Sequence, residues 1–273
     1  MEIRVLGPLE AEINGKVFLP TAGKPRQVLS ILALNPNQVI AASTLMEELW
    51  GTELPRSALT TLQTYILQIR RHLGSVLDQD SDQTPKSVLV TQHGGYRLNI
   101  APTAVDVRRY EQLVVEGIGA AEGGEDVRAS ELFGRALDMW RGSALVDVDT
   151  GPILEIEVMR LQESRLSTLE HRIKADLRLG RHAELLTELT ALTARHPLHE
   201  GLHAHHIVAM CRSGRQWQAL EIYQTLRHRF IDELGLEPSP RLRRLHQAVL
   251  ASDPALDIMP KPRRDEAEPH LAF

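Results

Sequence analysis

The sequence has almost no cysteine and no long hydrophobic run, and both absences limit what the protein can be. Its single cysteine, Cys211, excludes an intramolecular disulfide and is typical of a protein kept in a reducing compartment. No apolar stretch approaches the ~20 residues of a membrane-spanning helix, and the opening residues MEIRVLGPLE lack the pattern of a signal peptide. We therefore expect a cytoplasmic protein that does not contact a membrane.

A surplus of positive charge, the usual mark of a nucleic-acid-binding domain, is also missing. The formal net charge is −5, and the first 100 residues contain nine lysines and arginines against nine aspartates and glutamates. The acids are clustered, however, and segments 54–77 and 83–105 contain only cations. A neutral domain with a locally basic face is therefore still compatible with DNA binding.

Residues 57–98 contain the most informative pattern in the chain. Apolar residues at helical spacing form one stripe of an amphipathic helix, namely Leu59, Leu62, Ile66, Ile69 and Leu73. The opposite face carries Thr60, Thr61, Thr64, Gln68 and Arg71. Hydroxyls, amides and cations without a carboxylate suit phosphates and base edges, although a merely solvated face is the alternative. A β-type run with a tight turn at Gly94-Gly95 predicts a hairpin over 87–100 beside this helix.

The residues before this stretch predict a compact scaffold. Loose alternation about Asn14-Gly15 predicts a small antiparallel sheet over residues 2–20. A helix is expected from Pro25 to about residue 35, and Ser43 is expected to cap a second helix that ends before Gly51. Short strands, three helices and a terminal hairpin are the order of a winged helix-turn-helix, which we place at residues 1–100.

The pattern after residue 102 is helical throughout and contains a repeat. Gly124, Gly180 and Gly214 are each followed by apolar residues five, nine and twelve positions later, and the last two glycines are 34 residues apart. The first gap of 56 residues requires a longer helix over 152–179 or an irregular insertion. We predict a tetratricopeptide-like solenoid at 104–251, closed by a helix near 240–251. The fold class is therefore mainly α, and the proline-rich residues 252–273 are expected to be a disordered tail.

Two sets of motifs carry a resemblance to known regulators. The strings LMEELWG, TYILQIRRHL and VTQHGGYRL resemble the DNA-binding domain of OmpR- and PhoB-type response regulators. The combination that runs from KPRQVLSILAL to HGGYRL is closer to the SARP activators, the Streptomyces antibiotic regulatory proteins. The helical segment resembles the bacterial transcriptional activation domain of the same family, so the resemblance covers about residues 1–251. Because no receiver domain precedes the winged helix, we do not expect phosphorylation of such a domain to act as the switch.

The resemblance implies a set of DNA contacts. Thr60, Thr64, Gln68 and Arg71 are expected to face the major groove, with Thr61 on the same face and Gln68 as the best partner for adenine. Other expected contacts, mostly to the DNA backbone, come from Tyr65, Arg70, Trp50, Lys24, Arg26, His93 and Arg97. Gln92 stands in the wing where PhoB-type relatives often have an arginine, which weakens any prediction that the wing reads a narrow minor groove.

The resemblance also implies how transcription is activated. The expected function is sequence-specific activation of secondary-metabolite (antibiotic) genes, with protomers side by side on direct repeats of double-stranded promoter DNA near the −35 element. The expected partner is RNA polymerase holoenzyme, through its sigma factor or alpha subunit. The helical domain and one loop are the expected polymerase contacts, and the loop consists of Gly51, Thr52, Glu53, Leu54, Pro55 and Arg56. A tetratricopeptide-type adaptor that binds protein instead of DNA is the alternative.

One motif points to a different chemistry. Residues 199–203 match H-E-x-x-H, in which His199 and His203 would hold zinc and Glu200 would act as a base. The pentad directly follows Pro197, and the extended form of the motif fails at His206. No phosphate-binding GxxxxGK[ST] string and no nucleophile–base constellation is present in the sequence. We therefore expect no enzymatic activity, no cofactor and no metal site.

Overall fold

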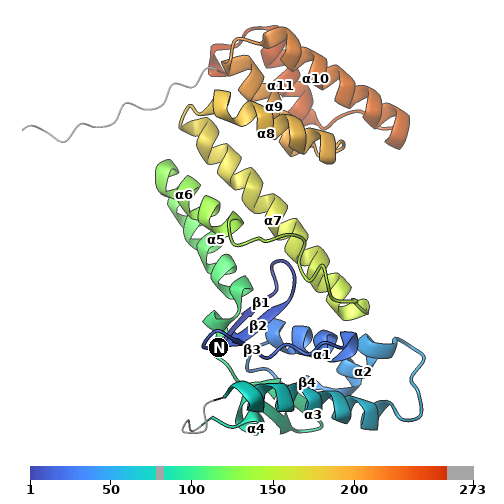
Figure 1. Ribbon diagram of the computed structural model, residues 1–273. Coiled ribbons are helices and arrows are strands. Elements are labelled where there is room, and N and C mark those ends of the chain that lie inside the picture. Colours follow the sequence, from blue (N-terminus) through green and yellow to red (C-terminus); the bar gives the residue numbers. More distant parts are fainter. Residues whose placement is uncertain (78–82, 257–273) are drawn as a thin grey trace, which may run out of the picture. The chain divides into compact units, whose positions relative to one another are not determined.

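The computed structural model describes residues 1–77 and 83–256 (Figure 1). The chain forms two compact units, of which the first comprises Met1–Gly119 and Glu131–Leu169 and the second comprises Ala120–Ser130 and the chain from Glu170 onward. None of the helices in the described part is long and apolar enough to cross a membrane. The disordered tail expected at 252–273 was predicted to start too early, because residues 254–256 form a 3-10 turn and the Leu256 carbonyl accepts a hydrogen bond from Arg212 at 2.8 Å. The rest of that tail, from 257 on, lies outside the described residues.

The chain begins with a small antiparallel sheet in the order β1-β2-β3, made of β1 (Glu2–Arg4), β2 (Glu10–Ile13) and β3 (Lys16–Val17). The turn between β2 and β3 places Asn14 and Gly15 at φ angles of 49° and 75°. Two consecutive positive φ angles are what a type I′ hairpin turn requires, and asparagine and glycine adopt them at little cost. The predicted N-terminal sheet is therefore confirmed.

Three helices and a second sheet form the winged helix-turn-helix. The helices are α1 (Gly23–Leu34), α2 (Ala42–Trp50) and α3 (Ala58–Val76), and a short α4 (Pro85–Val88) precedes the wing. The sheet has the order β4-β6-β5, with β4 (Ile40–Ala41), β5 (Leu89–Gln92) and β6 (Gly95–Leu98). The apolar stripe of α3 is buried as predicted at Leu62, Ile66, Ile69 and Leu73. Leu59 was predicted wrongly, because it lies at the edge of that stripe in the first turn and is 49% exposed.

The start of α2 and the tip of the wing also differ from the prediction. Ser43 does not cap α2, because strand β4 leads directly into the helix and the amide of Ala42 donates to the Gly94 carbonyl at 3.0 Å. The hairpin turn consists of His93 and Gly94, at φ angles of 49° and 74°, and not of Gly94 and Gly95. Gly95 has a different role, because a Cβ there would lie 2.3 Å from the Ile40 carbonyl oxygen of the paired strand β4.

The first unit continues across the expected domain boundary at 100–104. It includes most of α5 (Asp106–Glu122) and the first part of α7 (Pro152–Arg178). The Asp106 carboxylate accepts the amides of Val5 and Leu6, at 2.9 and 3.1 Å. The buried Glu48 of α2 accepts three amides at the start of α7, from Gly151, Ile153 and Leu154. The winged helix and the first helices that follow it are thus joined by hydrogen bonds to two buried carboxylates.

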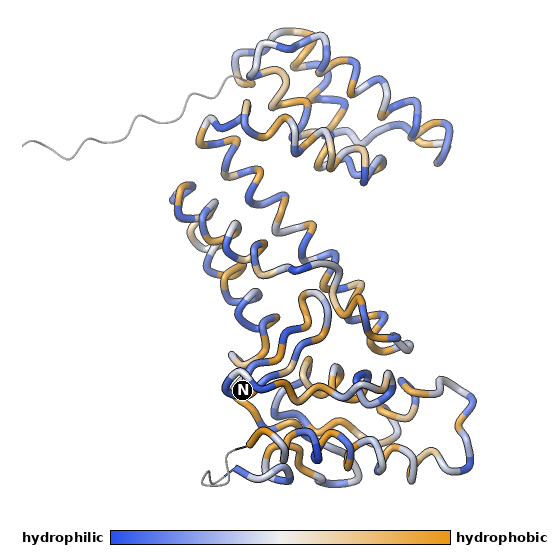
Figure 2. Tube along the Cα trace, in the orientation of Figure 1, coloured by the Kyte–Doolittle hydropathy of each residue, from blue (hydrophilic) through white to orange (hydrophobic). Residues whose placement is uncertain are grey.

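The remaining helices form the predicted repeat. They are α6 (Asp126–Leu137), α8 (His182–Arg195), α9 (Glu200–Arg212), α10 (Gln216–Arg229) and α11 (Pro240–Leu250), with a π-helical turn at Phe230–Leu234. Figure 2 shows hydrophobic and hydrophilic residues recurring within single turns of these helices, as amphipathic packing requires. Gly124, Gly180 and Gly214 lie in turns at φ angles of 77°, 79° and 72°. The gap of 56 residues is explained by both alternatives, since α7 is 27 residues long and an irregular segment precedes it.

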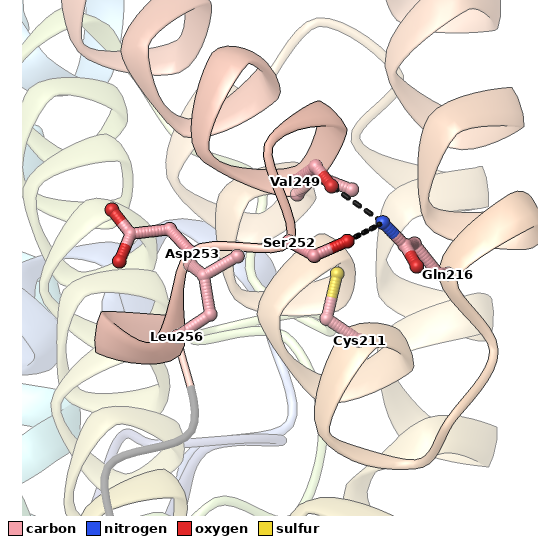
Figure 3. A pocket seen from close by; sticks show the side chains of 6 residues that line it. All are labelled: Cys211, Gln216, Val249, Ser252, Asp253 and Leu256. Carbon is pink, nitrogen blue, oxygen red and sulfur yellow. Dashed lines mark hydrogen bonds between the residues drawn. The ribbon is translucent and has the colours of Figure 1, made fainter.

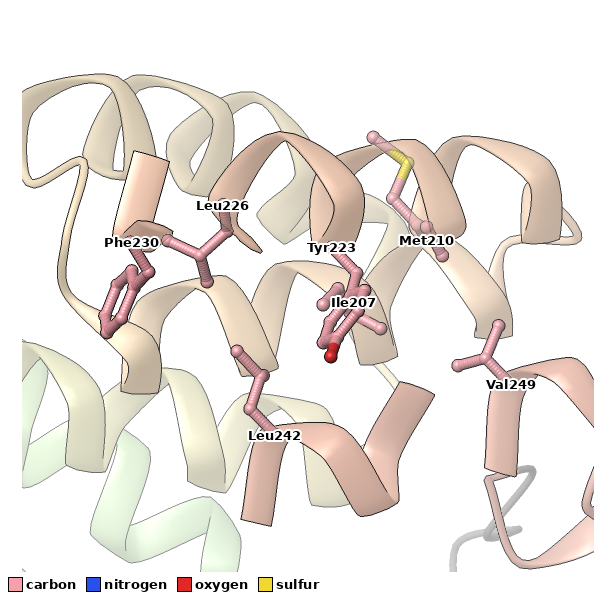
Figure 4. Close-up of a cluster of buried hydrophobic side chains, with 8 residues drawn as sticks. Ile207, Met210, Tyr223, Leu226, Phe230, Leu242 and Val249 are labelled. Carbon is pink, nitrogen blue, oxygen red and sulfur yellow. The ribbon is translucent and has the colours of Figure 1, made fainter. Parts of the chain in front are cut away.

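The core of the second unit lies where the repeat predicted it. Tyr223 and Leu226 of α10 pack with Ile207 and Met210 of α9, and α11 closes the cluster with Leu242 and Val249 (Figure 4). The ring of Tyr223 also stacks on His246 at a centroid distance of 3.9 Å. The closing helix predicted near 240–251 is therefore confirmed, and it covers the apolar surface at the end of the solenoid.

Candidate nucleic-acid interface

The exposed face of α3 carries no carboxylate and is polar apart from Leu67. Thr60, Thr64 and Arg71 are exposed on it, and Thr61 and Gln68 are half-buried at its edge. The Thr64 hydroxyl donates to the Thr60 carbonyl at 3.0 Å, which leaves its oxygen able to accept a further hydrogen bond. The Arg71 guanidinium makes no ion pair or hydrogen bond with any residue that the structure describes. This face is therefore open to a polar or anionic partner.

Arg70 has a different environment from its neighbour Arg71. Its guanidinium donates twice to the Leu89 carbonyl, at 3.0 Å from Nε and 2.7 Å from a terminal nitrogen, and once to the Thr91 hydroxyl at 2.8 Å. Burial lowers the pKa of Arg70 and raises the pKa of nearby Tyr96, whose pKa the Arg70 charge lowers in opposition. Arg70 thus fastens α3 to strand β5, and this geometry argues against the free phosphate contact expected from the sequence.

The wing, which is the β5–β6 hairpin, has an exposed turn at its tip and two buried polar atoms along its strands. His93 is exposed at the tip of the β5–β6 hairpin, whereas Gln92 and Arg97 are half-buried along the strands. The Gln92 Oε1 and Arg97 Nε atoms are buried without a hydrogen-bond partner among residues 1–77 and 83–256. Unpaired polar atoms of this kind are rare in folded proteins, so a ligand or water is expected to meet them.

The predicted phosphate contacts at the other end of α3 already have partners within the chain. The Lys24 ammonium donates to the Leu49 carbonyl at 3.1 Å and lies 4.7 Å from the ring centroid of Trp50. Trp50 in turn stacks with Tyr65 of α3 at a centroid distance of 6.4 Å. Arg26 forms an ion pair with Asp147. Lys24, Trp50 and Tyr65 therefore join the start of α1, the end of α2 and the middle of α3. Fewer cations are left free on this face than the sequence suggested.

The loop between α2 and α3 is exposed along its length. Gly51 ends α2 at a φ angle of 59°, a conformation that glycine adopts readily. The next five residues are all exposed, including Leu54 at 53%. The Leu54 side chain is therefore accessible to a protein partner.

Reasoning from the sequence missed one exposed residue on this face of α3. Leu67 is 48% exposed and follows Thr60 by seven residues and Thr64 by three, which places it on the same helix face. Arg71 follows Leu67 by four. The helical spacing was a sufficient signal, but only polar residues were considered for this face and Leu67 was assigned to neither face of the helix.

The pentad at 199–203 has structural roles. His199 Nδ1 accepts the Leu202 amide at 3.3 Å and so caps α9, and the Glu200 carboxylate accepts the Ser239 amide at 2.7 Å. His203 is buried. Across residues 1–77 and 83–256, no three histidine, cysteine, aspartate or glutamate side chains are grouped so as to hold a metal ion. Helix capping and packing therefore explain the motif.

Comparison with known proteins accounts for nearly the whole chain. A family model described as "Bacterial transcriptional activator domain" matches residues 105–250, and one described as "Transcriptional regulatory protein, C terminal" matches residues 17–98. The chain is 54% identical over 257 residues to regulatory protein DnrI of Streptomyces peucetius, which covers 94% of each protein. It is 34% identical to transcriptional regulator RedD of Streptomyces coelicolor, over 94% of this chain and 73% of RedD.

The fold comparison agrees with the sequence comparison. The structure of Mycobacterium tuberculosis EmbR, solved in complex with a low affinity phosphopeptide, matches with a TM-score of 0.85 at 31% sequence identity. The match covers 92% of this chain and 65% of the EmbR chain. Both compact units therefore have a counterpart in one solved relative.

Proposed function

The chain belongs to the SARP family of transcriptional activators, and we propose that it activates antibiotic-biosynthesis genes by binding direct repeats near the −35 element of their promoters. The observation that carries this proposal is the carboxylate-free, exposed face of α3 next to the wing. Hydroxyls, an amide and a guanidinium on one helix face can meet both phosphates and base edges in the major groove. Proteins of this kind act on promoter DNA in the cytoplasm, and we propose no enzymatic activity for the chain.

The side chains of α3 divide by the kind of contact that they can make. Gln68 can donate and accept together at adenine, and the hydroxyls of Thr60 and Thr64 can bond to bases or phosphates. Leu67 has no polar group, so its exposed side chain suits the methyl group of thymine. Arg71 is free to meet a phosphate. The wing adds His93 at its tip and the half-buried Gln92 and Arg97.

Direct repeats imply a particular arrangement of protomers. Two copies on repeated half-sites face the same way, so the contact between them joins two different surfaces and need not persist without DNA. Each α3 face offers one free cation, Arg71, and we therefore propose weak binding to a single half-site and tight binding only by neighbours on the DNA. RNA polymerase holoenzyme would be engaged by the exposed loop at residues 51–56 and by the helical domain, through its sigma factor or alpha subunit.

Footprinting on promoters of the neighbouring gene cluster, followed by a mobility-shift assay over a salt series, tests the proposal. We expect protection of two repeats with the same orientation and a steep loss of affinity as salt concentration rises. A chain that binds no promoter fragment but captures a protein through its solenoid would instead support the tetratricopeptide-type adaptor. Limited proteolysis would test the division into domains at 1–100 and 104–251.

A further inference from the structure

The second unit contains a cavity of about 270 Å³ between helices α8, α9 and α10. Its floor is buried and consists of Thr193, His203, His206 and Leu226. Its rim is exposed and consists of Thr190, Ala194, Glu221, Thr225 and Arg229, and Ile222 lies between the two. The cavity therefore has a polar floor, an apolar side and an open mouth with charges of both signs. None of these residues belongs to the interface proposed for DNA.

His203 is the unusual group in this cavity. It is only 7% exposed, yet neither of its ring nitrogens makes a hydrogen bond of ordinary geometry with any described residue. Burial, and then the nearby His206, lower the pKa of His203 to about 4, while the Pro197 carbonyl, which lies close to the ring as a hydrogen-bond acceptor of poor geometry, raises it. The ring is therefore neutral at pH 7, with one nitrogen that donates and one that accepts.

The neighbouring His206, unlike His203, has hydroxyl groups within hydrogen-bond reach of its ring. Its Nδ1 lies 3.4 Å from the Thr193 hydroxyl and its Nε2 lies 3.5 Å from the Thr190 hydroxyl. The Thr193 hydroxyl also donates to the Leu189 carbonyl at 2.8 Å, so it can only accept from His206. Burial lowers the pKa of His206 as well. The Thr190 hydroxyl likewise donates to the Leu186 carbonyl at 2.8 Å, so the single N–H of a neutral His206 can serve one of the two hydroxyls. Two neutral imidazoles thus lie on the floor, and only that of His206 has a hydroxyl partner.

A buried polar group without a partner destabilises a protein, and such groups are rare unless a ligand or water completes them. We propose that this cavity binds a compact ring compound that carries a hydroxyl group and, on the side toward the solvent, an acidic group. The hydroxyl would pair with the His203 ring, Leu226 and Ile222 would pack on the ring system, and the Arg229 guanidinium would meet the acidic group at the mouth. Glu221 on the same rim would disfavour a second negative charge.

The size of the cavity limits the ligand further. Sites for drug-sized molecules are usually about 300–1,000 Å³, so a cavity of about 270 Å³ suits one or two fused rings. A second cavity in this unit carries no such argument. It measures about 90 Å³, and Figure 3 shows that its Gln216 amide is already hydrogen-bonded to the Val249 carbonyl and the Ser252 hydroxyl, at 2.6 and 3.1 Å.

Binding of 6-hydroxy-2-naphthoate, whose hydroxyl and carboxylate lie at opposite ends of the ring system, to the full chain tests the proposal, with calorimetry for affinity and the His203 ring signals in NMR for location. We expect saturable binding and a shift of the His203 signals. The matched ligand 2-naphthoate, which lacks the hydroxyl, should bind at least about tenfold more weakly. Because the assay contains no DNA, its failure would not bear on the proposed promoter binding.

Three variants locate the site. Ala194→Phe places a ring at the exposed mouth and should abolish binding, whereas Ala191→Phe, at an exposed position of the same helix that does not line the cavity, should not. His203→Leu should remove the preference for the hydroxyl and raise the melting temperature, since it removes an unpaired buried group. Should His203→Leu fail to fold, the comparison of Ala194→Phe with Ala191→Phe still decides the outcome. No binding at about 5 mM, or binding that all three variants retain, would overturn the proposal, and so would an unshifted His203 signal.

Discussion

The carboxylate of Glu48 accepts the backbone amide of Gly151 at 2.7 Å, across 103 positions of the sequence. The same carboxylate accepts the amides of Ile153 and Leu154, so a side chain from α2 satisfies the free N–H groups at the start of α7. Gly151 is required at this contact, because a Cβ there would lie 2.0 Å from the Glu48 carbonyl oxygen. The helix that precedes the exposed loop is therefore fixed to the longest helix of the chain.

Replacing Glu48 by alanine should destabilise the first unit. Three amides would lose a charged acceptor in a buried place, and we expect a loss on the order of 3 kcal/mol in the free energy of unfolding. Urea denaturation followed by circular dichroism measures it. Glu47→Ala is the matched control, since Glu47 is exposed on the same helix, and it should change stability by less than about 0.5 kcal/mol. Equal effects of the two substitutions would contradict this account of the cap.

Arg70 and Arg71 should respond differently to alanine substitution although they are adjacent. If Arg71 meets a phosphate, Arg71→Ala should weaken binding to all sequences and reduce the slope of log affinity against log salt by about one unit. Arg70→Ala should loosen the hairpin and weaken binding with little change in the slope, because its donors are held by Leu89 and Thr91. Mobility-shift assays over a salt series separate the two. A change of slope for Arg70→Ala and none for Arg71→Ala would reverse the assignment.

Gln68 should act on specificity and not on general affinity. Gln68→Ala is expected to cost ~1–3 kcal/mol on the cognate repeat and to relax the preference at one base pair. Competition against sites with each base pair altered in turn measures the change. The control is Gln224→Ala, an exposed glutamine of α10 that lies outside the proposed interface. A uniform loss over all altered sites would place Gln68 on the DNA backbone.

Stability should fall as the pH is lowered from about 7 to 5, because of histidines that are neutral in the folded state. Burial lowers the pKa of His203 and of His205 to about 4, from an ordinary 6.5. Between these values the unfolded chain binds protons that the folded chain does not, so the free energy of unfolding decreases with falling pH. Above pH 7 both states are neutral and this contribution is constant. We expect each histidine to account for roughly 1–2 kcal/mol between pH 7 and 5.

Urea denaturation of the wild type and of His203→Leu at pH 7 and pH 5 measures the share of His203. The variant should lose less stability than the wild type over this interval. His228→Leu, at an exposed position, is the control and should leave the difference between the two pH values unchanged. A pH dependence that His203→Leu does not reduce would contradict the assignment.

The order of elements, the core of α3 and the solenoid repeat could be predicted because they depend on local spacing. Leu62 and Ile66 repeat with the helix, and Gly180 and Gly214 repeat with the tetratricopeptide period. The roles of the cations could not be predicted in this way. Arg70 and Arg71 are adjacent residues of the same type. The Arg70 side chain donates to the Leu89 carbonyl, 19 residues later in the sequence, whereas the Arg71 side chain is exposed.

Partners far apart in sequence limit the prediction elsewhere too. Arg26 pairs with Asp147, and Asp106 binds the amides of Val5 and Leu6 about 100 positions earlier. These contacts join segments that the sequence assigns to different domains. No local pattern predicts such a contact, since it depends on which surfaces meet after the helices have packed.

The hydrogen bonds that hold Arg70 of α3 to strand β5 also limit which DNA sites such a protein can bind. A reading helix and a wing held by three hydrogen bonds cannot change their separation independently. If α3 and the wing both contact one repeat, as we propose, a base pair inserted inside that repeat should move the wing's contact out of reach while the helix keeps its own. The spacing between repeats is set by a different contact, between protomers. Length within a repeat should therefore be invariant, even where its individual bases and the gap between repeats are not.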